Sequence, residues 1–285
     1  MAPSRVVGMN STDQQARALT FRRLHDEGVL VLPNAWDAGS AAMIAAAGAK
    51  AIATTSAGVS WAQGRSDGQH LTRDEMVALV RRIAETVDLP VTADVEGGYG
   101  PDPEDVAETV RAAVGAGIVG INLEDSRPEG DLFDPAAQAE RIRAAREAAA
   151  GAGLPELFVN LRTDVFLFGI GAPEGRLDDV LSRAEAYVAA GADGLFVPGL
   201  LDLETIEAVT SRVPVPVNVM VGEGAPDVAA LAGAGVRRVS LGMAVAQAAY
   251  TVARKAAVEA LTDGTYGSLA GSDGFGDING AFPSR

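Results

Sequence analysis

The feature that most limits the fold is a short pattern that returns four times along the chain. A run of small residues, a glycine and a buried apolar strand occur in this order at 46–52, 116–121, 190–196 and 234–239. Small residues followed by glycine are typical of a helix that ends in a left-handed cap, so each copy predicts a helix and then a strand. Near-continuous apolar strands are typical of parallel sheets covered by helices on both faces.

Eight such strands can be traced, and they alternate with helices. The predicted strands are 29–32, 51–54, 90–93, 118–123, 157–161, 194–197, 216–220 and 236–241. This pattern predicts a (β/α)8 TIM barrel within residues 1–262, with a leading helix at 12–28. A doubly wound open sheet is the alternative, but no Gly-x-Gly-x-x-Gly phosphate loop follows the first strand. We assign no regular structure to the Gly- and Ser-rich tail, 263–285.

Acidic side chains follow several of these strands. Asp94 and Glu96 follow strand 90–93, Glu124 follows the next strand, and Asp67 lies in a loop after an earlier one. A barrel brings the carboxyl ends of its strands to one rim, so these carboxylates are expected to meet there. Like charges held close together need a cation or a proton, and oxygen ligands suit Mg²⁺ or Mn²⁺. We predict a metal site made of these four carboxylates; a polar strand end in solvent is the alternative for the Asp94–Glu96 pair.

Other residues expected at this rim suit an organic acid. Arg162, after strand 157–161, can hold a substrate carboxylate with its planar fork, or serve only as a counterion of the acids. The segment Thr55, Ser56, Ala57 and Gly58 is expected to be a turn whose amides and hydroxyls bind a second carboxylate or an oxyanion. Trp36 and Asn218 are further candidates for substrate contact, with wall packing as the alternative for Trp36. These groups predict a site for a small dianion, a 2-oxo or 2-hydroxy dicarboxylate.

Residue counts exclude several chemistries. The chain of 285 residues has no cysteine, which excludes disulfides, thiolate metal sites and a catalytic thiol. Lys50 and Lys255 are the only lysines and lie away from the expected rim, which disfavours a Schiff-base aldolase. With only His25 and His70, a three-histidine metal site is excluded. A formal charge of −15 disfavours nucleic acid and anionic membranes as partners. With no apolar run long enough for a membrane span and no secretory signal, we expect a cytoplasmic protein.

Five segments resemble the isocitrate lyase and phosphoenolpyruvate mutase superfamily. They are Pro-Asn-Ala-Trp-Asp at 33–37, Thr-Thr-Ser-Ala-Gly at 54–58, Asp-Val-Glu-Gly-Gly-Tyr-Gly at 94–100, Asn-Leu-Glu-Asp at 122–125 and Leu-Arg-Thr-Asp at 161–164. The resemblance implies a TIM barrel whose last helix is exchanged between subunits, usually in a homotetramer built as a dimer of dimers. It also implies a magnesium-bound 2-oxo acid as the small-molecule partner.

The same resemblance implies roles for single residues. Asp94 is the expected direct metal ligand, whereas Glu96, Glu124 and Asp67 are expected to hold metal-bound waters. Arg162 and the segment 55–58 are the expected contacts of the substrate carboxylate.

One loop departs from the family pattern. Residues 127–134, Arg-Pro-Glu-Gly-Asp-Leu-Phe-Asp, lack the cysteine, lysine and histidine of the isocitrate and methylisocitrate lyases. They also lack the lysine and asparagine that the mutase and phosphonopyruvate hydrolase carry there. What remains resembles the branch that includes oxaloacetate decarboxylase and carboxyvinyl-carboxyphosphonate phosphorylmutase-like proteins.

This branch implies a Mg-dependent lyase that cleaves a carbon–carbon bond of an oxaloacetate-like acid through a metal-bound enolate. Asp67, Glu124 and Arg162 are the candidate catalytic residues. Two alternatives stay open: a phosphonate enzyme acting on a phosphorus–carbon bond, and a barrel that binds a metabolite without turnover.

Overall fold

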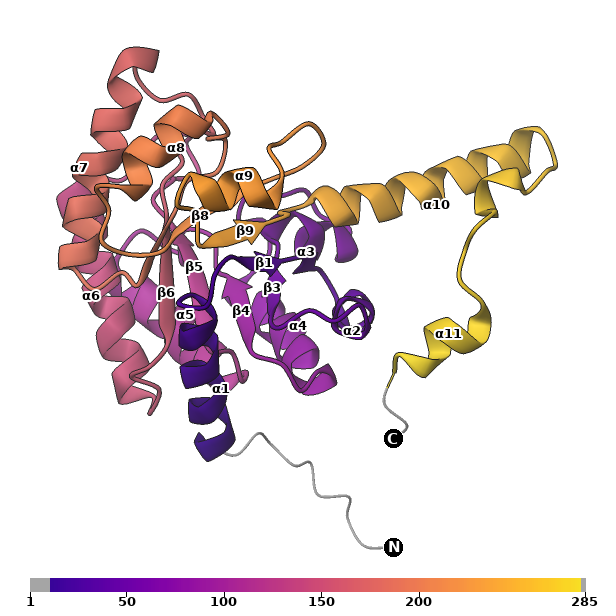
Figure 1. Cartoon of the computed structure of the whole chain (residues 1–285). Helices are drawn as coiled ribbons and strands as arrows, with labels where there is room; N and C mark the ends of the chain where they lie inside the picture. Colours follow the sequence, from indigo (N-terminus) through magenta and orange to yellow (C-terminus); the bar gives the residue numbers. More distant parts are fainter. Residues whose placement is uncertain (1–10, 283–285) are drawn as a thin grey trace, which may run out of the picture.

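The computed structural model describes residues 11–282, in which strands and helices alternate around a barrel (Figure 1). The strands are β1 (Leu30–Leu32), β2 (Asn34–Ala35), β3 (Ile52–Thr54), β4 (Val91–Asp94), β5 (Gly120–Glu124), β6 (Phe158–Arg162), β7 (Gly194–Phe196), β8 (Val217–Met220) and β9 (Arg238–Ser240). The helices are α1 (Ser11–Leu24), α2 (Ala38–Ala46), α3 (Ser56–Ala62), α4 (Arg73–Thr86), α5 (Pro103–Gly115), α6 (Pro135–Gly151), α7 (Arg176–Ala189), α8 (Leu203–Thr210), α9 (Val228–Gly233), α10 (Ala244–Thr262) and α11 (Phe275–Gly280). Short 3-10 turns lie at Pro173–Gly175 and Gly267–Leu269.

The barrel closes through its first strand, which is split in two. Every named strand pairs in parallel with its neighbours, in the order β1-β9-β8-β7-β6-β5-β4-β3-β2. Pro33 lies between the two parts and interrupts the ladder, because proline has no N–H to donate. β1 therefore pairs with β9, and β2 pairs with β3 on the other side. The predicted TIM barrel is confirmed.

The repeated glycine pattern marks helix ends, as predicted. Gly48, Gly117, Gly191 and Gly235 have positive φ angles of 94°, 97°, 108° and 85°. Each follows a helix and precedes a strand, so the backbone reverses where only glycine is unstrained. Each copy of the pattern therefore marks where a helix ends and the next strand begins.

The structure differs from the prediction at three places. Residues 55–58 form no turn, because Thr55 is the N-cap residue of α3, which begins at Ser56. The leading helix ends at Leu24 instead of continuing to Gly28. Residues 263–282 of the predicted tail contain a 3-10 turn and α11, although their side chains are almost all exposed.

The helix α10 leaves the body of the barrel and extends away from it (Figure 1). Among its 19 residues only Ala246 is buried. Val252, Val258 and Leu261 are 52%, 50% and 86% exposed. No helix in the described part of the chain is both long and apolar enough to cross a membrane.

Candidate active site

A cavity opens at the carboxyl ends of the strands, the face of a TIM barrel that carries the active site in this fold. Its volume is about 510 Å³ with the open mouth included. The cavity is lined by Asn34, Thr55, Ser56, Ala57, Asp67, Asp94, Asn122, Arg162, Leu167, Phe196, Met220, Ser240, Gly242 and Met243. Six of the residues predicted for the site therefore line this one cavity: Thr55, Ser56, Ala57, Asp67, Asp94 and Arg162.

Asp94 is the last residue of β4, and its position is fixed from both sides. Its backbone N–H donates to Oγ1 of Thr54 on β3 at 2.8 Å. The amides of Ser56 and Glu96 donate to its two carboxylate oxygens, each at 3.2 Å. Ser56 is the first residue of α3, so the positive end of a short helix faces this carboxylate.

Glu96 lies in the same region but is not part of the strand. β4 ends at Asp94, and Glu96 has a left-handed φ of 49° instead of continuing the strand. Its carboxylate accepts hydrogen bonds from the Gln69 amide at 2.5 Å and from the Tyr99 hydroxyl at 3.1 Å. Gln69 and Tyr99 also have positive φ angles, 58° and 61°. Three non-glycine residues in this uncommon conformation around one carboxylate indicate a tightly specified site.

The carboxylates of Asp67, Asp94 and Glu96 are electrostatic neighbours. Burial, then Asp94, and to a smaller degree Asp67, raise the pKa of Glu96 to about 7. Burial and the Asp94 charge also raise the pKa of Asp67, although the Ser56 hydroxyl opposes this rise. The loop of Asp67 therefore brings a third acid to the end of β4, as predicted.

Arg162 lies between two acids at the end of β6. Its Nη1 is 2.8 Å from Oε2 of Glu124, and its Nε is 2.6 Å from Oδ1 of the fully buried Asp164. Burial raises the pKa of Glu124, and the Arg162 charge opposes that rise. Arg162 also lines the cavity, so its remaining nitrogen, Nη2, is the atom available to a carboxylate ligand.

A buried group behind Arg162 holds the ends of β5 and β6 together. Asp125 accepts the Asp164 amide at 3.0 Å and the Tyr187 hydroxyl at 2.7 Å. Arg183 lies 3.3 Å from the same Asp125 carboxylate. These contacts fix the backbone that presents Arg162 and Glu124.

Three predicted substrate contacts do not line the cavity. Asn218 is fully buried inside the barrel, where its Oδ1 accepts the Ser240 hydroxyl at 3.2 Å, because the strand continues to Met220 before reaching the rim. Trp36 packs against Tyr250 of α10, with ring centroids 6.5 Å apart. Gly58 lies inside α3, where a Cβ would stand 2.8 Å from both Trp36 Cβ and Thr55 Cγ2.

Gly58→Ala is therefore expected to lower the free energy of unfolding by about 1–3 kcal/mol, because α3 would have to move off Trp36. Urea unfolding measures this loss. Gly115→Ala is the matched control, because its Cβ would meet nothing within 4 Å at the end of α5. An equally stable Gly58→Ala protein would contradict the close packing of α3.

Several residues that line the cavity were not among the predicted site residues. Asn34, Asn122 and Ser240 are polar strand residues, and Leu167, Phe196, Met220 and Met243 are apolar. The rule that strand ends face the rim could have found Phe196, Met220 and Ser240. The apolar side chains carry no sign of chemistry in the sequence.

Comparison with known proteins identifies the family. Residues 21–261 match the family described as phosphoenolpyruvate phosphomutase. The chain belongs to the phosphoenolpyruvate mutase family. The resemblance to the isocitrate lyase and phosphoenolpyruvate mutase superfamily is thereby confirmed.

Relatives within this family include lyases and proteins without a known activity. An uncharacterized protein of Mycobacterium tuberculosis is 39% identical over 247 residues, which cover 86% of this chain and 90% of the relative. Oxaloacetate decarboxylase of Pseudomonas savastanoi pv. phaseolicola is 32% identical over 203 residues, which cover 68% of this chain and 65% of the relative. 2-Methylisocitrate lyase of Escherichia coli is 31% identical over 203 residues, which cover 68% of this chain and 66% of the relative. A Burkholderia cenocepacia crystal structure, provisionally described as a lyase or mutase, has a TM-score of 0.87 and 40% identity, covering 94% of this chain and 96% of that one.

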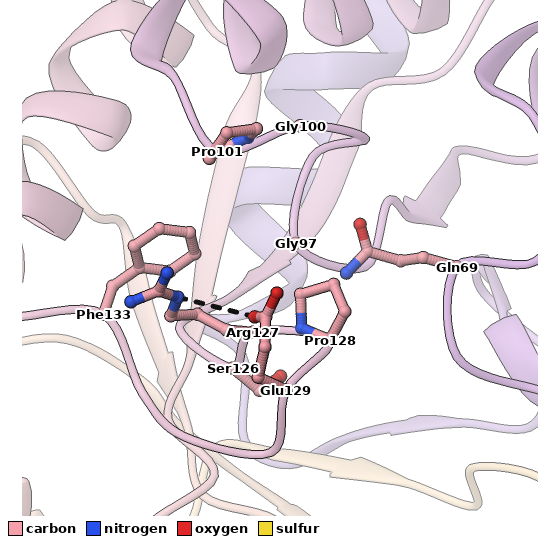
Figure 2. A pocket seen from close by; sticks show the side chains of 9 residues that line it. All are labelled: Gln69, Gly97, Gly100, Pro101, Ser126, Arg127, Pro128, Glu129 and Phe133. Atoms are coloured by element: carbon pink, nitrogen blue, oxygen red, sulfur yellow. Dashed lines mark ion pairs between the residues drawn. The ribbon is translucent and has the colours of Figure 1, made fainter.

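The loop that departs from the phosphoenolpyruvate mutase family pattern borders a second pocket (Figure 2). Figure 2 shows Arg127 between the Phe133 ring and the Glu129 carboxylate. The guanidinium carbon lies 5.3 Å from the ring centroid, and Nε lies 3.7 Å from Glu129 and 3.6 Å from Asp131. Arg127, Glu129 and Asp131 are thus engaged with one another, whereas Asp134 caps α6 and accepts the Ala136 amide. None of these four side chains lines the barrel cavity.

The acids around Asp94 fit a hard cation that is held largely through water. Within residues 11–282, no three Asp, Glu or His side chains lie close enough together to ligate a metal directly. The predicted arrangement, with Asp94 as the direct ligand and three acids that hold metal-bound waters, does not require such a group. Magnesium commonly takes only one or two protein carboxylates and keeps several waters. The crowded all-oxygen group around Asp94 fits that kind of site.

The metal-free protein is expected to lose stability as pH rises from about 5 to 8. Glu96 has a folded pKa of about 7, above the ordinary 4.5, so in this window the folded state binds more protons than the unfolded state. The loss from Glu96 alone is at most about 3 kcal/mol. Urea unfolding at several pH values measures it, and millimolar Mg²⁺ should remove most of the fall. Metal-free stability that does not fall over this window would contradict the crowding of these acids.

Proposed function

We propose that the chain is a Mg²⁺- or Mn²⁺-dependent lyase that cleaves a carbon–carbon bond beside the carbonyl of a small 2-oxo or 2-hydroxy carboxylate. The observation that carries this proposal is one cavity lined by the Arg162 guanidinium, the start of α3, and the carboxylates of Asp67 and Asp94. Kinship with oxaloacetate decarboxylase makes oxaloacetate the first substrate to test.

In this proposal, Asp94 would hold the cation directly, and Asp67, Glu96 and Glu124 would hold its waters. A bound divalent cation would supply a Lewis acid for a substrate carbonyl oxygen. Nη2 of Arg162 binds the substrate carboxylate, and Glu124 and Asp164 keep the guanidinium in place. The amides at the start of α3 orient the acid from the other side.

Asp67 is the proposed proton carrier. It lines the cavity, and its raised pKa brings it closer to neutral pH than an ordinary aspartate. Asp67 would donate a proton to the reacting carbon, or accept one from it, and no residue of the loop at 127–134 would be needed for this transfer.

Two other functions are tested against this one. A phosphonate enzyme is favoured by the family description, although the loop lacks the lysine expected for it. A metabolite-binding barrel without turnover is favoured by the same missing loop residues.

The test is to incubate the protein with oxaloacetate or phosphonopyruvate, with Mg²⁺ or with chelator, and to follow pyruvate and phosphate. Chelator-sensitive pyruvate from oxaloacetate, above the metal-only rate, supports the lyase. Pyruvate and phosphate from phosphonopyruvate would favour the phosphonate enzyme. Thermal stabilisation by either acid without product would favour the binding protein, and would overturn the lyase for these substrates.

We also propose that α10 packs on a second copy of the chain, in a homotetramer. The exposed Val258 and Leu261 on α10 then lie in an interface, so Val258→Glu with Leu261→Glu should lower the mass measured by light scattering. Leu201→Glu, a 37% exposed leucine before α8, is the matched control. An unchanged mass in the double variant would contradict the exchange of α10.

A further inference from the structure

The barrel cavity has two chemically different halves. Polar and charged side chains line the half that β3 to β6 provide, ending at Arg162. Leu167, Phe196, Met220 and Met243 line most of the other half, which follows β6 to β9, and the Ser240 hydroxyl of β9 is its one polar side chain among the described residues. The border is sharp, because Phe196 on β7 pairs in register with Arg162 on β6.

The apolar half is a packed wall. Phe196 is only 4% exposed, and its ring centroid lies 6.0 Å from the guanidinium carbon of Arg162. Met220 lies against Gly242, where a side chain would collide with its sulfur. Leu167 is held close to Gly199, where a Cβ would stand 2.8 Å from the Leu167 nitrogen. Glycine at these two positions therefore leaves room for the Met220 side chain and for the backbone of Leu167.

In the part of the chain that the structure describes, no cationic side chain of this half lines the cavity, because Arg238 on β9 is buried beneath it, where its Nη2 donates to Oδ1 of Asn122. Arg162 is the one cationic side chain among the described residues that line the cavity, and two of its nitrogens already contact Glu124 and Asp164. Asn218, which the sequence offered as a polar contact on this side, is buried below Met220. A carboxylate placed there would lose its hydration without gaining a partner.

We infer that the preferred substrate is an amphipathic acid: a 2-oxo or 2-hydroxy carboxylate head at Arg162 and Asp94, with an uncharged aliphatic remainder against Phe196, Met220 and Met243. The head rests on the proposed function. The aliphatic remainder rests on the apolar wall alone. Oxaloacetate then tests whether the protein cleaves a 2-oxo acid, but it is not the preferred substrate, because its second carboxylate fits the apolar wall poorly.

Calorimetric binding with Mg²⁺ present tests this inference without requiring turnover. The probes are pyruvate, 2-oxobutanoate, 3-methyl-2-oxobutanoate and 2-oxoglutarate. Burying one methylene tightens binding about fourfold, so 3-methyl-2-oxobutanoate should bind at least about tenfold tighter than pyruvate. 2-Oxoglutarate, with a second carboxylate, should bind more weakly than the branched acid.

Two variants assign the effect to the wall. Phe196→Ala should remove most of the preference for the branched acid, whereas Phe168→Ala, a 50% exposed phenylalanine outside the cavity, should keep it. Met243→Lys, at a partly exposed position, should weaken the branched acid and strengthen 2-oxoglutarate.

The outcomes separate this inference from the proposed function. Equal affinity along the alkyl series, or tighter binding of 2-oxoglutarate, overturns the inference while the acid head still binds. Selective binding of the branched acid without cleavage of any 2-oxo acid upholds it and overturns the lyase. If none of the probes binds, the inference is overturned, whereas the lyase is decided separately by the turnover of oxaloacetate.

Discussion

Asp94→Asn is expected to lower metal-dependent kcat/KM by about 1000-fold or more, with the fold intact. The predicted loss follows from the proposed cation, because a metal Lewis acid supplies several kcal/mol and each 1.36 kcal/mol is a factor of ten. Stability should hold or rise, because Asp94 is one of the charges that raise the pKa of Glu96. Turnover of oxaloacetate, Mg²⁺ titration by calorimetry and urea unfolding together measure these effects.

Asp88→Asn is the matched control for this variant. Asp88 lies just before β4, at the end of the strand opposite to Asp94. Its side chain is fully exposed and lies 3.4 Å from Arg17, so its substitution should change neither turnover nor Mg²⁺ affinity. If Asp94→Asn retained wild-type turnover and metal affinity, the direct ligand would have to be another residue. If both variants lost activity equally, the loss would reflect net charge instead of the site.

The barrel could be predicted because its signals are local. The small residues and glycine before each strand, such as Gly117 and Gly191, specify a helix end and the next strand within a few positions. Once the alternation is known, the barrel itself places strand ends together. For this reason Asp94, Arg162 and the loop residue Asp67 could be assigned to one rim from sequence alone.

The rest of the site depends on tertiary packing, which sequence spacing does not report. Glu96 was expected at the rim after strand 90–93, but its left-handed backbone and the hydrogen bond that its carboxylate accepts from Gln69, 27 positions earlier, could not be predicted from the spacing. Residues 55–58 have the hydroxyls and glycine of a turn. They form a helix start because Gly58 lets α3 pack against Trp36.

Arg162→Met is expected to lower the free energy of unfolding by about 3–5 kcal/mol at neutral pH, because it leaves the buried Glu124 and Asp164 carboxylates without their cation. The loss should shrink as pH falls. Without the guanidinium, the folded pKa of Glu124 rises further above its unfolded value, so the folded variant binds more protons than the unfolded chain and gains stability toward acid. Urea unfolding of variant and wild type at pH 5.5 and 8 measures the difference.

Arg162→Lys separates charge from shape. A lysine keeps one positive charge near Glu124, so much of the stability should remain. It lacks the guanidinium fork, which contacts two acids and leaves Nη2 for a ligand. Pyruvate and oxalate should therefore bind at least about tenfold more weakly to this stable variant, in line with the loss of a charge-assisted hydrogen bond. A deficit of Arg162→Met that is the same at both pH values would mean that the two carboxylates are not its cause. Wild-type affinity in Arg162→Lys would mean that Arg162 is only their counterion.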